Sequence, residues 1–159
     1  MNKTKLKLVR NTVHQIDTRR IRMNVVLDKW AFMPEKAHPE DAGWDIRTPY
    51  RVMLRKRDSV TIDSGVHIQI PKGCVGMLKS KSGLNVNHGI TSEGVIDSGY
   101  TGSICVKLYN NSDKHYIFEQ GDKITQLVIM PITMDELELV EEFEGETERG
   151  NNGFGSSGR

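Results

Sequence analysis

Apolar and polar side chains alternate in several short stretches of the chain. The alternation is clear in VHIQI (66–70) and ICVKLY (104–109), and briefer in VTI (60–62). A period of two places every second side chain on one face, which predicts half-buried β-strands. Glycine and proline interrupt these stretches at short intervals, as in IPKG and EQGD. Many short strands without helical spacers predict an all-β sandwich or jelly roll.

Two stretches have a different pattern. KSGLNVNHGI (81–90) is the best candidate for a single short helix. MDELELVEEFE (134–144) fits a helix poorly, because its acidic residues would fall on every side. Extended as a strand, it places Leu137, Leu139 and Phe143 on one face. We therefore expect a strand there.

Length and composition favour one domain with a packed core. The chain has 159 residues, of which 27% are charged, and a net charge of +1, so we expect no nucleic-acid partner. No apolar run is long enough to cross a bilayer, and no histidine or cysteine spacing indicates zinc. Cys74 and Cys105 lie far apart, which favours free thiols in a reducing cytoplasm.

The two ends of the chain differ in composition from the centre. Residues 1–22 contain seven basic residues and one acidic residue, so we expect an added arm before a domain over 23–144. The arm is either a solvated extension or an element that binds a partner protein. A solvated extension is favoured over nucleic-acid binding, because the arm has no aromatic side chain to stack on a base. Residues 145–159 form a glycine-rich tail.

Two stretches contain residue types that suit phosphate chemistry. In GVIDSGYTGSI (94–104), Asp97 follows an apolar strand, where a carboxylate can orient and deprotonate water or simply form an Asx turn. In GMLKSKSGL (76–84), lysines and serines precede the expected helix. Hydroxyls, ammonium groups and the backbone N–H groups of a helix start bind anions together, although a solvated basic turn has the same composition.

Three further stretches place polar groups in unusual surroundings. DAGWDIRT (41–48) contains Asp45 beside Gly43, which permits an unusual backbone angle. GDKITQLVI (121–129) places the Gln126 amide among apolar residues, where it needs hydrogen-bond partners. In the tail ERGNNGFGSSGR (148–159), Phe154 stands alone between glycines.

In this order, AGWDIRT, KSKSGL, GVIDSGYTG, GDKITQLVI and RGNNGFGSSG resemble the five motifs of the trimeric dUTPase family. The resemblance implies a jelly roll of the dUTPase β-clip type with one short helix, closed as a homotrimer. It also implies that the protein hydrolyses dUTP to dUMP and pyrophosphate, with Mg²⁺ as cofactor and water attacking the α-phosphate. Each active site of the family is shared by three subunits.

The resemblance also implies roles for individual residues. Asp97 would hold and activate the water, and Tyr100 would pack under the deoxyribose and leave no room for a 2′-hydroxyl. Asp45 would reach Mg²⁺ through water, with the metal held mainly by substrate phosphates. The phosphates would contact Lys81, Ser82, Gly83 and Gln126.

Uracil recognition and closure of the site depend on two further segments. The base would be read by backbone groups of Gly94, Val95 and Ile96, or by the side chain of Thr91 or Ser92. The tail would act as a lid over a neighbouring subunit's site, with Phe154 stacked on uracil. Its residues near the γ-phosphate would be Arg149, Gly155, Ser156 and Ser157.

The sequence departs from the family pattern in three places. Lys81 replaces the usual arginine, Gly99 replaces a second aspartate in the third motif, and the short hairpin ITSEG (90–94) lacks the asparagine that many relatives use on uracil. Lys107 occupies the position at which the related dCTP deaminases carry a glutamate, which disfavours deamination, the first alternative function. The second alternative is a phage-type dUTPase that also binds a regulatory protein. The short link 110–120 lacks the insertion expected of that type.

Overall fold

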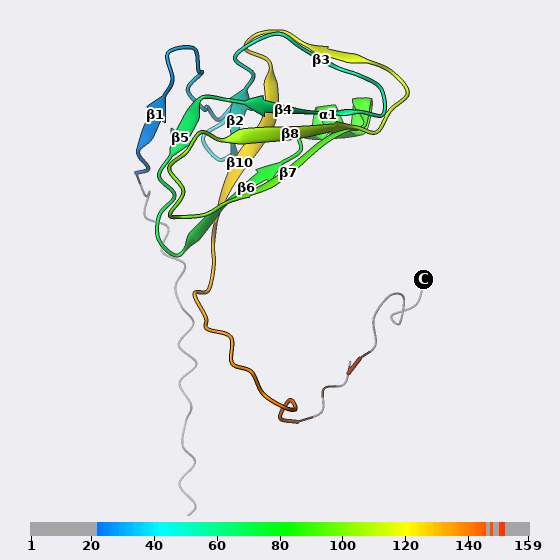
Figure 1. Ribbon diagram of the computed structural model, residues 1–159. Coiled ribbons are helices and arrows are strands. Elements are labelled where there is room, and N and C mark those ends of the chain that lie inside the picture. The colour runs from blue at the N-terminus through cyan, green and yellow to red at the C-terminus, as the bar shows by residue number, and fades with distance from the viewer. Residues whose placement is uncertain (1–21, 146, 148–149, 152–159) are drawn as a thin grey trace, which may run out of the picture.

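The computed structural model describes residues 22–145, 147 and 150–151. Its elements in chain order are β1 (Val25–Leu27), β2 (Gly43–Arg47), β3 (Val52–Leu54), β4 (Ser59–Asp63), β5 (Val66–Ile68), β6 (Cys74–Lys79), α1 (Ser82–His88), β7 (Ile90–Ile96), β8 (Cys105–Asn110), β9 (Tyr116–Phe118) and β10 (Lys123–Pro131). The prediction of an all-β fold with one short helix is confirmed for the described part of the chain (Figure 1).

Six antiparallel strands form the main sheet, in the order β2-β10-β6-β7-β8-β4. Two small ladders, β1–β5 and β3–β9, complete the jelly roll. The alternation read from the sequence is confirmed in β8, where Val106 and Leu108 are buried and Cys105 is exposed. The largest fully buried side chains form one core: Phe118, Ile46, Leu54, Ile62, Ile70, Leu78, Ile90, Ile104, Leu108, Ile124, Leu127 and Val66.

Strand β7 has a different hydrogen-bonded neighbour over each half of its length. It pairs with β8 from Ile90 to Ser92, whereas it pairs with β6 from Glu93 to Ile96. Beyond Ser92 the two strands β7 and β8 diverge, as Figure 1 shows away from α1. The edge of β7 that faces β8 is therefore open over residues 93–96.

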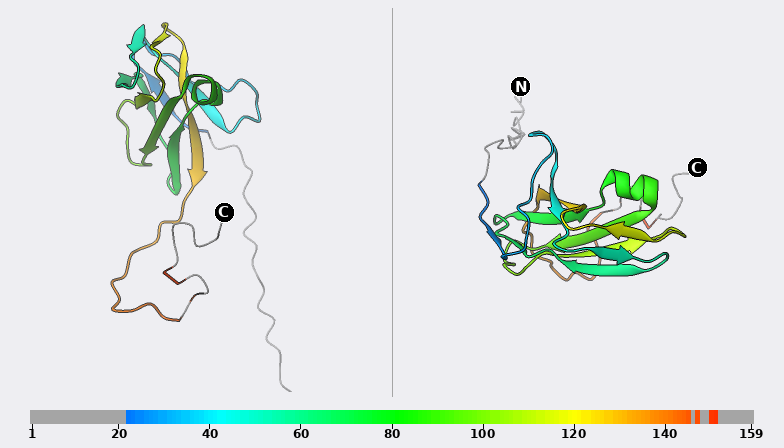
Figure 2. Two further views of the ribbon diagram at one scale, coloured as in Figure 1. Left: turned by 90° about the vertical axis from the view of Figure 1, so that its right-hand side faces the viewer. Right: turned by 90° about the horizontal axis from the view of Figure 1, so that it is seen from above.

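The expected helix is confirmed, with bounds inside the predicted range. Lys81 is its N-cap residue in extended conformation, and Gly89 ends it with a left-handed φ of 65°. Glycine adopts that conformation without steric cost, which explains the sharp stop. Leu84 is the one buried residue of α1. The helix therefore packs on the core through a single apolar side chain, and it projects beside the strands (Figure 2).

The strand expected over 134–144 is wrong. Residues 132–145 contain no strand or helix, and they leave β10 and run away from the sheets (Figure 2). Leu137, Leu139 and Phe143 are 102%, 99% and 93% exposed. The apolar face predicted from the sequence exists, but a strand needs a hydrogen-bonded neighbour, and this chain places none beside it.

The structure adds two facts about cellular setting. The single helix of the described residues has seven residues, and no helix there is long and apolar enough to cross a membrane. Cys74 and Cys105 are both free thiols. The cytoplasmic location stays a prediction.

Candidate active site

The residues expected near phosphate converge from three elements. The register pairs Gln126 of β10 with Asp45 of β2 on one side and with Lys79 of β6 on the other. Two residues after Lys79, the chain reaches Lys81 at the start of α1. This arrangement brings the first, second and fourth sequence motifs together within one chain.

Asp45 is the centre of this group. Its side chain is 8% exposed, and Lys81 Nζ donates a hydrogen bond to Oδ1 while Lys123 Nζ lies 2.6 Å from Oδ2. Burial alone raises the pKa of the Asp45 carboxyl, but hydrogen bonds from Lys123 and Lys81 outweigh it and lower the pKa below its ordinary 3.8. We call Asp45, Lys81, Lys123 and Gln126 the cationic cluster. Two ammonium groups face one carboxylate, so the cluster keeps an excess positive charge that suits an anion.

Lys123 was missed by the sequence analysis, although GDKITQLVI contains it. Nothing in a linear sequence shows that a lysine at the start of β10 meets an aspartate on β2. The adjacent Thr125 was missed as well: its buried hydroxyl donates to the Lys79 carbonyl at 3.0 Å and lies 2.6 Å from Ser92 Oγ. The need of Gln126 for partners is met in part by a long hydrogen bond, 3.4 Å, from Nε2 to the Ser80 carbonyl.

The same contacts bear on uracil recognition. Ser92 is 1% exposed, and its hydroxyl faces Thr125 inside the fold, away from any bound base. Thr91 is half-buried, and its hydroxyl accepts a hydrogen bond from Asn111 at 3.3 Å. Residues 94–96 of β7 have no strand partner on the side of β8, so backbone groups on that edge stay open to a ligand.

The expectation of an unusual backbone angle at Gly43 is wrong. Gly43 lies within β2 and has no left-handed φ. A Cβ at this position would lie 3.1 Å from Gln126 Cβ and 3.1 Å from Val128 Cγ2. Glycine is present because β2 and β10 approach each other closely there. The left-handed glycine of this region is Gly121, with φ 88°, in the turn before β10.

Asp97 and Tyr100 lie at the far end of β7. Asp97 is the first residue after the strand and is exposed. Tyr100 is 45% exposed, and its backbone N–H donates to the Asp97 carbonyl at 3.0 Å, which closes a tight turn. The turn therefore carries an exposed carboxylate and a partly exposed aromatic ring, three positions apart in the sequence.

Within one chain, the cationic cluster and the turn that carries Asp97 and Tyr100 lie far apart. In the β6–β7 ladder, Lys79 pairs with Glu93, whereas Gly76 pairs with Ile96. Lys81 lies beyond the first pair and Asp97 beyond the second, so about six residues separate them along the strands. At about 3.3 Å per residue this is about 20 Å, far beyond hydrogen-bond reach. The cationic cluster and the Asp97 turn occupy opposite ends of the ladder.

The remaining predicted site residues fall into two classes. Ser82 and Gly83 form the first, exposed turn of α1, beside Lys81. Arg149, Phe154, Gly155, Ser156 and Ser157 lie outside the described residues, so their roles stay predictions.

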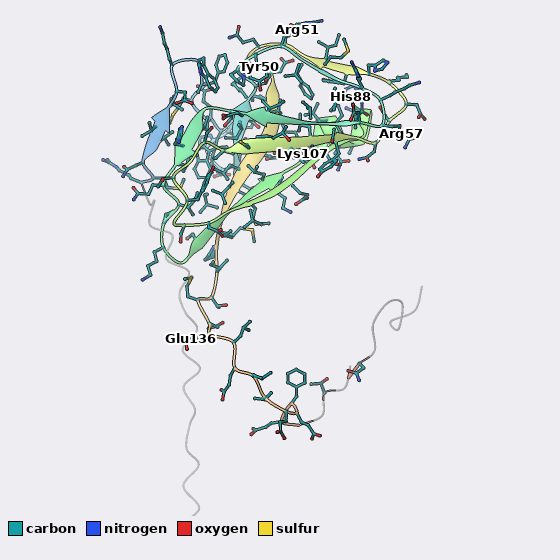
Figure 3. All side chains as sticks on the ribbon, in the orientation of Figure 1. Tyr50, Arg51, Arg57, His88, Lys107 and Glu136 are labelled. Carbon is teal, nitrogen blue, oxygen red and sulfur yellow. The ribbon has the colours of Figure 1, made fainter. Side chains whose placement is uncertain are left out.

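Lys107, the residue that disfavours deamination, lies on β8 (Figure 3). Its Nζ is 5.8 Å from the centre of the Tyr109 ring. A lysine at this position lacks the carboxylate that the deaminases use for proton transfer.

Comparison with known proteins gives one consistent result. The family model described as dUTPase matches residues 29–158. The chain is 38% identical over 135 residues to the deoxyuridine 5′-triphosphate nucleotidohydrolase of Clostridium kluyveri, covering 83% of this chain and 94% of that protein. It is 40% identical over 139 residues to the protein of the same name from Tropheryma whipplei strain Twist, covering 84% and 94%.

Solved structures agree. The chain superposes on the dUTPase of Staphylococcus bacteriophage 80alpha with dUPNHPP, with a TM-score of 0.81 and 36% identity over 87% of this chain and 99% of that chain. It also matches a mutant dUTPase from phage phi11 of S. aureus, described with a structural Mg(II) ion, with a TM-score of 0.72 and 33% identity. That match covers 79% of this chain and all of the other.

Proposed function

The chain belongs to the dUTPase family and hydrolyses dUTP, and we propose that its active site forms where the cationic cluster of one subunit meets Asp97 and Tyr100 of a neighbour. The observation that carries this proposal is the separation of the two groups along the β6–β7 ladder. A single subunit holds phosphate-binding groups and a catalytic carboxylate that cannot reach the same substrate. Two subunits placed side by side supply both.

A homotrimer supplies such neighbours, and the surface of the chain supports assembly. Val95 and Val86 are 61% and 81% exposed, and Leu137, Leu139 and Phe143 are almost fully exposed. Monomers rarely leave this much apolar surface in contact with water. A closed three-fold assembly would cover it with the same surfaces of other copies.

Asp97 acts as the general base. An exposed carboxylate at the end of a rigid strand can accept a hydrogen bond from water and orient it toward the α-phosphate. The water oxygen bonds to the α-phosphorus while its proton passes to Asp97, and the bond from the α-phosphorus to the α–β bridging oxygen breaks, which releases dUMP and pyrophosphate. Tyr100 lies on the same turn, and its ring packs under the deoxyribose, where a 2′-hydroxyl would collide with it.

The cationic cluster binds the phosphate chain. Lys81, Ser82 and Gly83 surround the start of α1, and Gln126 lies next to them on β10. Asp45 suits a hydrated Mg²⁺, because a carboxylate can accept about four hydrogen bonds and the two lysines occupy two of them. The described residues contain no group of three or more His, Cys, Asp or Glu side chains that could hold a metal ion. When bound, Mg²⁺ neutralises charge on those phosphates.

Uracil is read by the open edge of β7. Backbone N–H and C=O groups of residues 94–96 match the carbonyl acceptors and the N3–H donor of the base. The tail completes the site from a third subunit, with Phe154 on the base and Arg149, Gly155, Ser156 and Ser157 at the γ-phosphate. Deleting residues after Glu148 is expected to leave a folded trimer with strongly reduced turnover, measured as pyrophosphate release.

Mixed trimers test the shared site directly. Lys81→Ala and Asp97→Asn chains are each expected to be nearly inactive. When the two are unfolded together and refolded as a 1:1 mixture, some sites receive an intact Lys81 from one chain and an intact Asp97 from another. Random assembly makes this fraction about one quarter, so activity should recover to about that share of wild type.

The controls distinguish a site shared between subunits from a site built within one chain. Each variant refolded alone should stay at its own low rate, and a Lys81→Ala/Asp97→Asn double variant mixed with itself should show no recovery. A 1:1 mixture that remains as inactive as its parents, despite verified subunit exchange, would mean that each chain builds its own site.

A further inference from the structure

The segment 97–104, which joins β7 to β8, has an ordered internal structure. Tyr100 Oη donates a hydrogen bond to the Ser103 carbonyl at 2.9 Å. The ring folds back over Gly102, where a Cβ would lie 2.5 Å from Tyr100 Cζ. Because real Cβ atoms do not approach that closely, any other residue at this position would push the ring away. The position of the Tyr100 ring therefore depends on the backbone of residues 101–103.

The turn between β4 and β5 holds that backbone from outside. Ser64 is fully buried, and its hydroxyl donates to the Ile104 carbonyl at 2.7 Å. The Asp63 carboxylate accepts a hydrogen bond from Ser103 Oγ and another from the Gly65 N–H at 3.0 Å. Asp63 thus links the Tyr100 segment to a turn that is itself fixed.

His67 on β5 adds a second link from the same hairpin. Its Nδ1 lies 2.9 Å from the Thr101 carbonyl. A carbonyl can only accept, so Nδ1 carries the hydrogen and donates it. On the opposite side of the ring, Nε2 lies 3.6 Å from Asp28 Oδ1. The hydrogen bond from Nδ1 holds Thr101, one residue after Tyr100, whereas the 3.6 Å contact at Nε2 is too long for a hydrogen bond.

From these contacts, and resting on the proposed function, we propose that Asp63 and His67 are positioning residues that fix the Tyr100 ring and thereby set the preference for deoxyribose over ribose. Neither residue belongs to any of the five motifs. They fix the segment on both sides of Gly102, at Thr101 and at Ser103. Exclusion of a 2′-hydroxyl by a ring face depends steeply on distance, because repulsion between atoms rises within a fraction of an ångström. Loss of the contact at Thr101 or at Ser103 would let the Tyr100 ring move away from the sugar, so that a ribose could bind.

The test compares kcat/KM for dUTP with kcat/KM for UTP in purified full-length protein. Asp63→Ala and His67→Ala are each expected to lower the dUTP/UTP ratio about tenfold, the usual worth of one hydrogen bond. Thr61→Ala, an exposed residue of the same hairpin strand β4, is the matched control and should keep the wild-type ratio. The ratio is informative because partial unfolding reduces the turnover of both substrates by the same factor.

A second His67 variant tests whether the hydrogen bond itself is responsible for the selectivity. His67→Asn places an amide nitrogen near the position of Nδ1, so it should restore most of the selectivity lost in His67→Ala. If Asp63→Ala fails to fold, the two His67 variants decide alone. Wild-type ratios in the Ala variants, with or without a lower melting temperature, would overturn the positioning role. Wild-type protein that fails to hydrolyse dUTP would instead overturn the proposed function.

Discussion

The two ends of the β6–β7 ladder hold their polar side chains in different ways. At one end, Asp45 is buried between two ammonium groups, and Thr125 and Ser92 share a buried hydroxyl contact. At the other end, Asp97 and Tyr100 project outward from a turn fixed by the backbone and by the β4–β5 hairpin. Charges at the first end contribute to the fold of the chain itself as well as to the proposed phosphate site, whereas exposed groups such as those of the second end contribute little to folding. Substitutions should therefore separate stability from activity.

The largest effect is expected at Asp97. Asp97→Asn keeps the shape of the side chain but removes its basicity, so turnover of dUTP should fall roughly 10²- to 10⁴-fold. The melting temperature should stay within a degree or two of wild type, since an exposed side chain contributes little to folding. Steady-state pyrophosphate release and thermal unfolding measure both quantities. A turnover within a few-fold of wild type would remove Asp97 from the role of base.

Asp45→Ala should lower stability as well as turnover. Removal of the carboxylate leaves two partly buried ammonium groups facing each other, which is expected to cost about 2 kcal/mol of stability. Chemical denaturation of the variant should show that loss with substrate absent, unlike Asp97→Asn. Asp113→Ala is a suitable control, because its ion pair with Arg57 lies on the surface and is worth little. Equal stability of the Asp45 and Asp113 variants would contradict a structural role for the cationic cluster.

A smaller effect is expected for Thr125→Val. Valine has the same shape but leaves the Ser92 hydroxyl without this partner, so stability should fall by about 1 kcal/mol. Turnover of dUTP should stay close to that of wild type. The Thr125 side chain is buried and contacts Lys79 and Ser92, so it has no exposed atom to offer a substrate. Loss of activity without loss of stability would show instead that Thr125 reaches the substrate.

The smallest effect concerns pH and the Asp63 link. Hydrogen bonds from Ser103 and from the Gly65 N–H lower the pKa of the Asp63 carboxyl below its ordinary 3.8. A lowered folded-state pKa means that the carboxylate stabilises the fold above pH 3.8 and loses this contribution as the pH falls through the folded-state value. Wild type should therefore exceed Asp63→Asn in stability at pH 6, and the difference should shrink below pH 3.8. Urea titrations at several pH values measure it, and a gap that widens at low pH would reverse the assigned sign.

The sequence predicted the parts of this molecule whose causes are local. Alternation located β8, and the helix expected within 81–90 lies at Ser82–His88. The five motifs predicted the site residues but not their partners. Lys123 and Asp45 lie 78 positions apart, and only the β2–β10 register brings them into contact.

The errors have physical causes as well. At Gly43 the small side chain reflects close strand packing, which has the same sequence signature as a turn glycine. At residues 134–144 the apolar alternation was identified correctly but assigned to a strand, because a sequence does not show whether a partner strand exists in the same chain. Asp63 and His67 were overlooked since they act through carbonyl and hydroxyl groups of a distant loop.

The exposed stretch after β10 also affects whether chains aggregate. Leu137, Leu139 and Phe143 are accessible to any other copy of the chain, as apolar segments in aggregating chains are. Acidic neighbours such as Glu136 (Figure 3) and Glu138 give each free segment a negative charge, so two segments repel each other. This repulsion reaches only about 10 Å at 0.1 M salt and shortens as ionic strength rises. Self-association of free segments is therefore slowest in dilute salt, and concentrated salt removes this kinetic protection from the newly made chain.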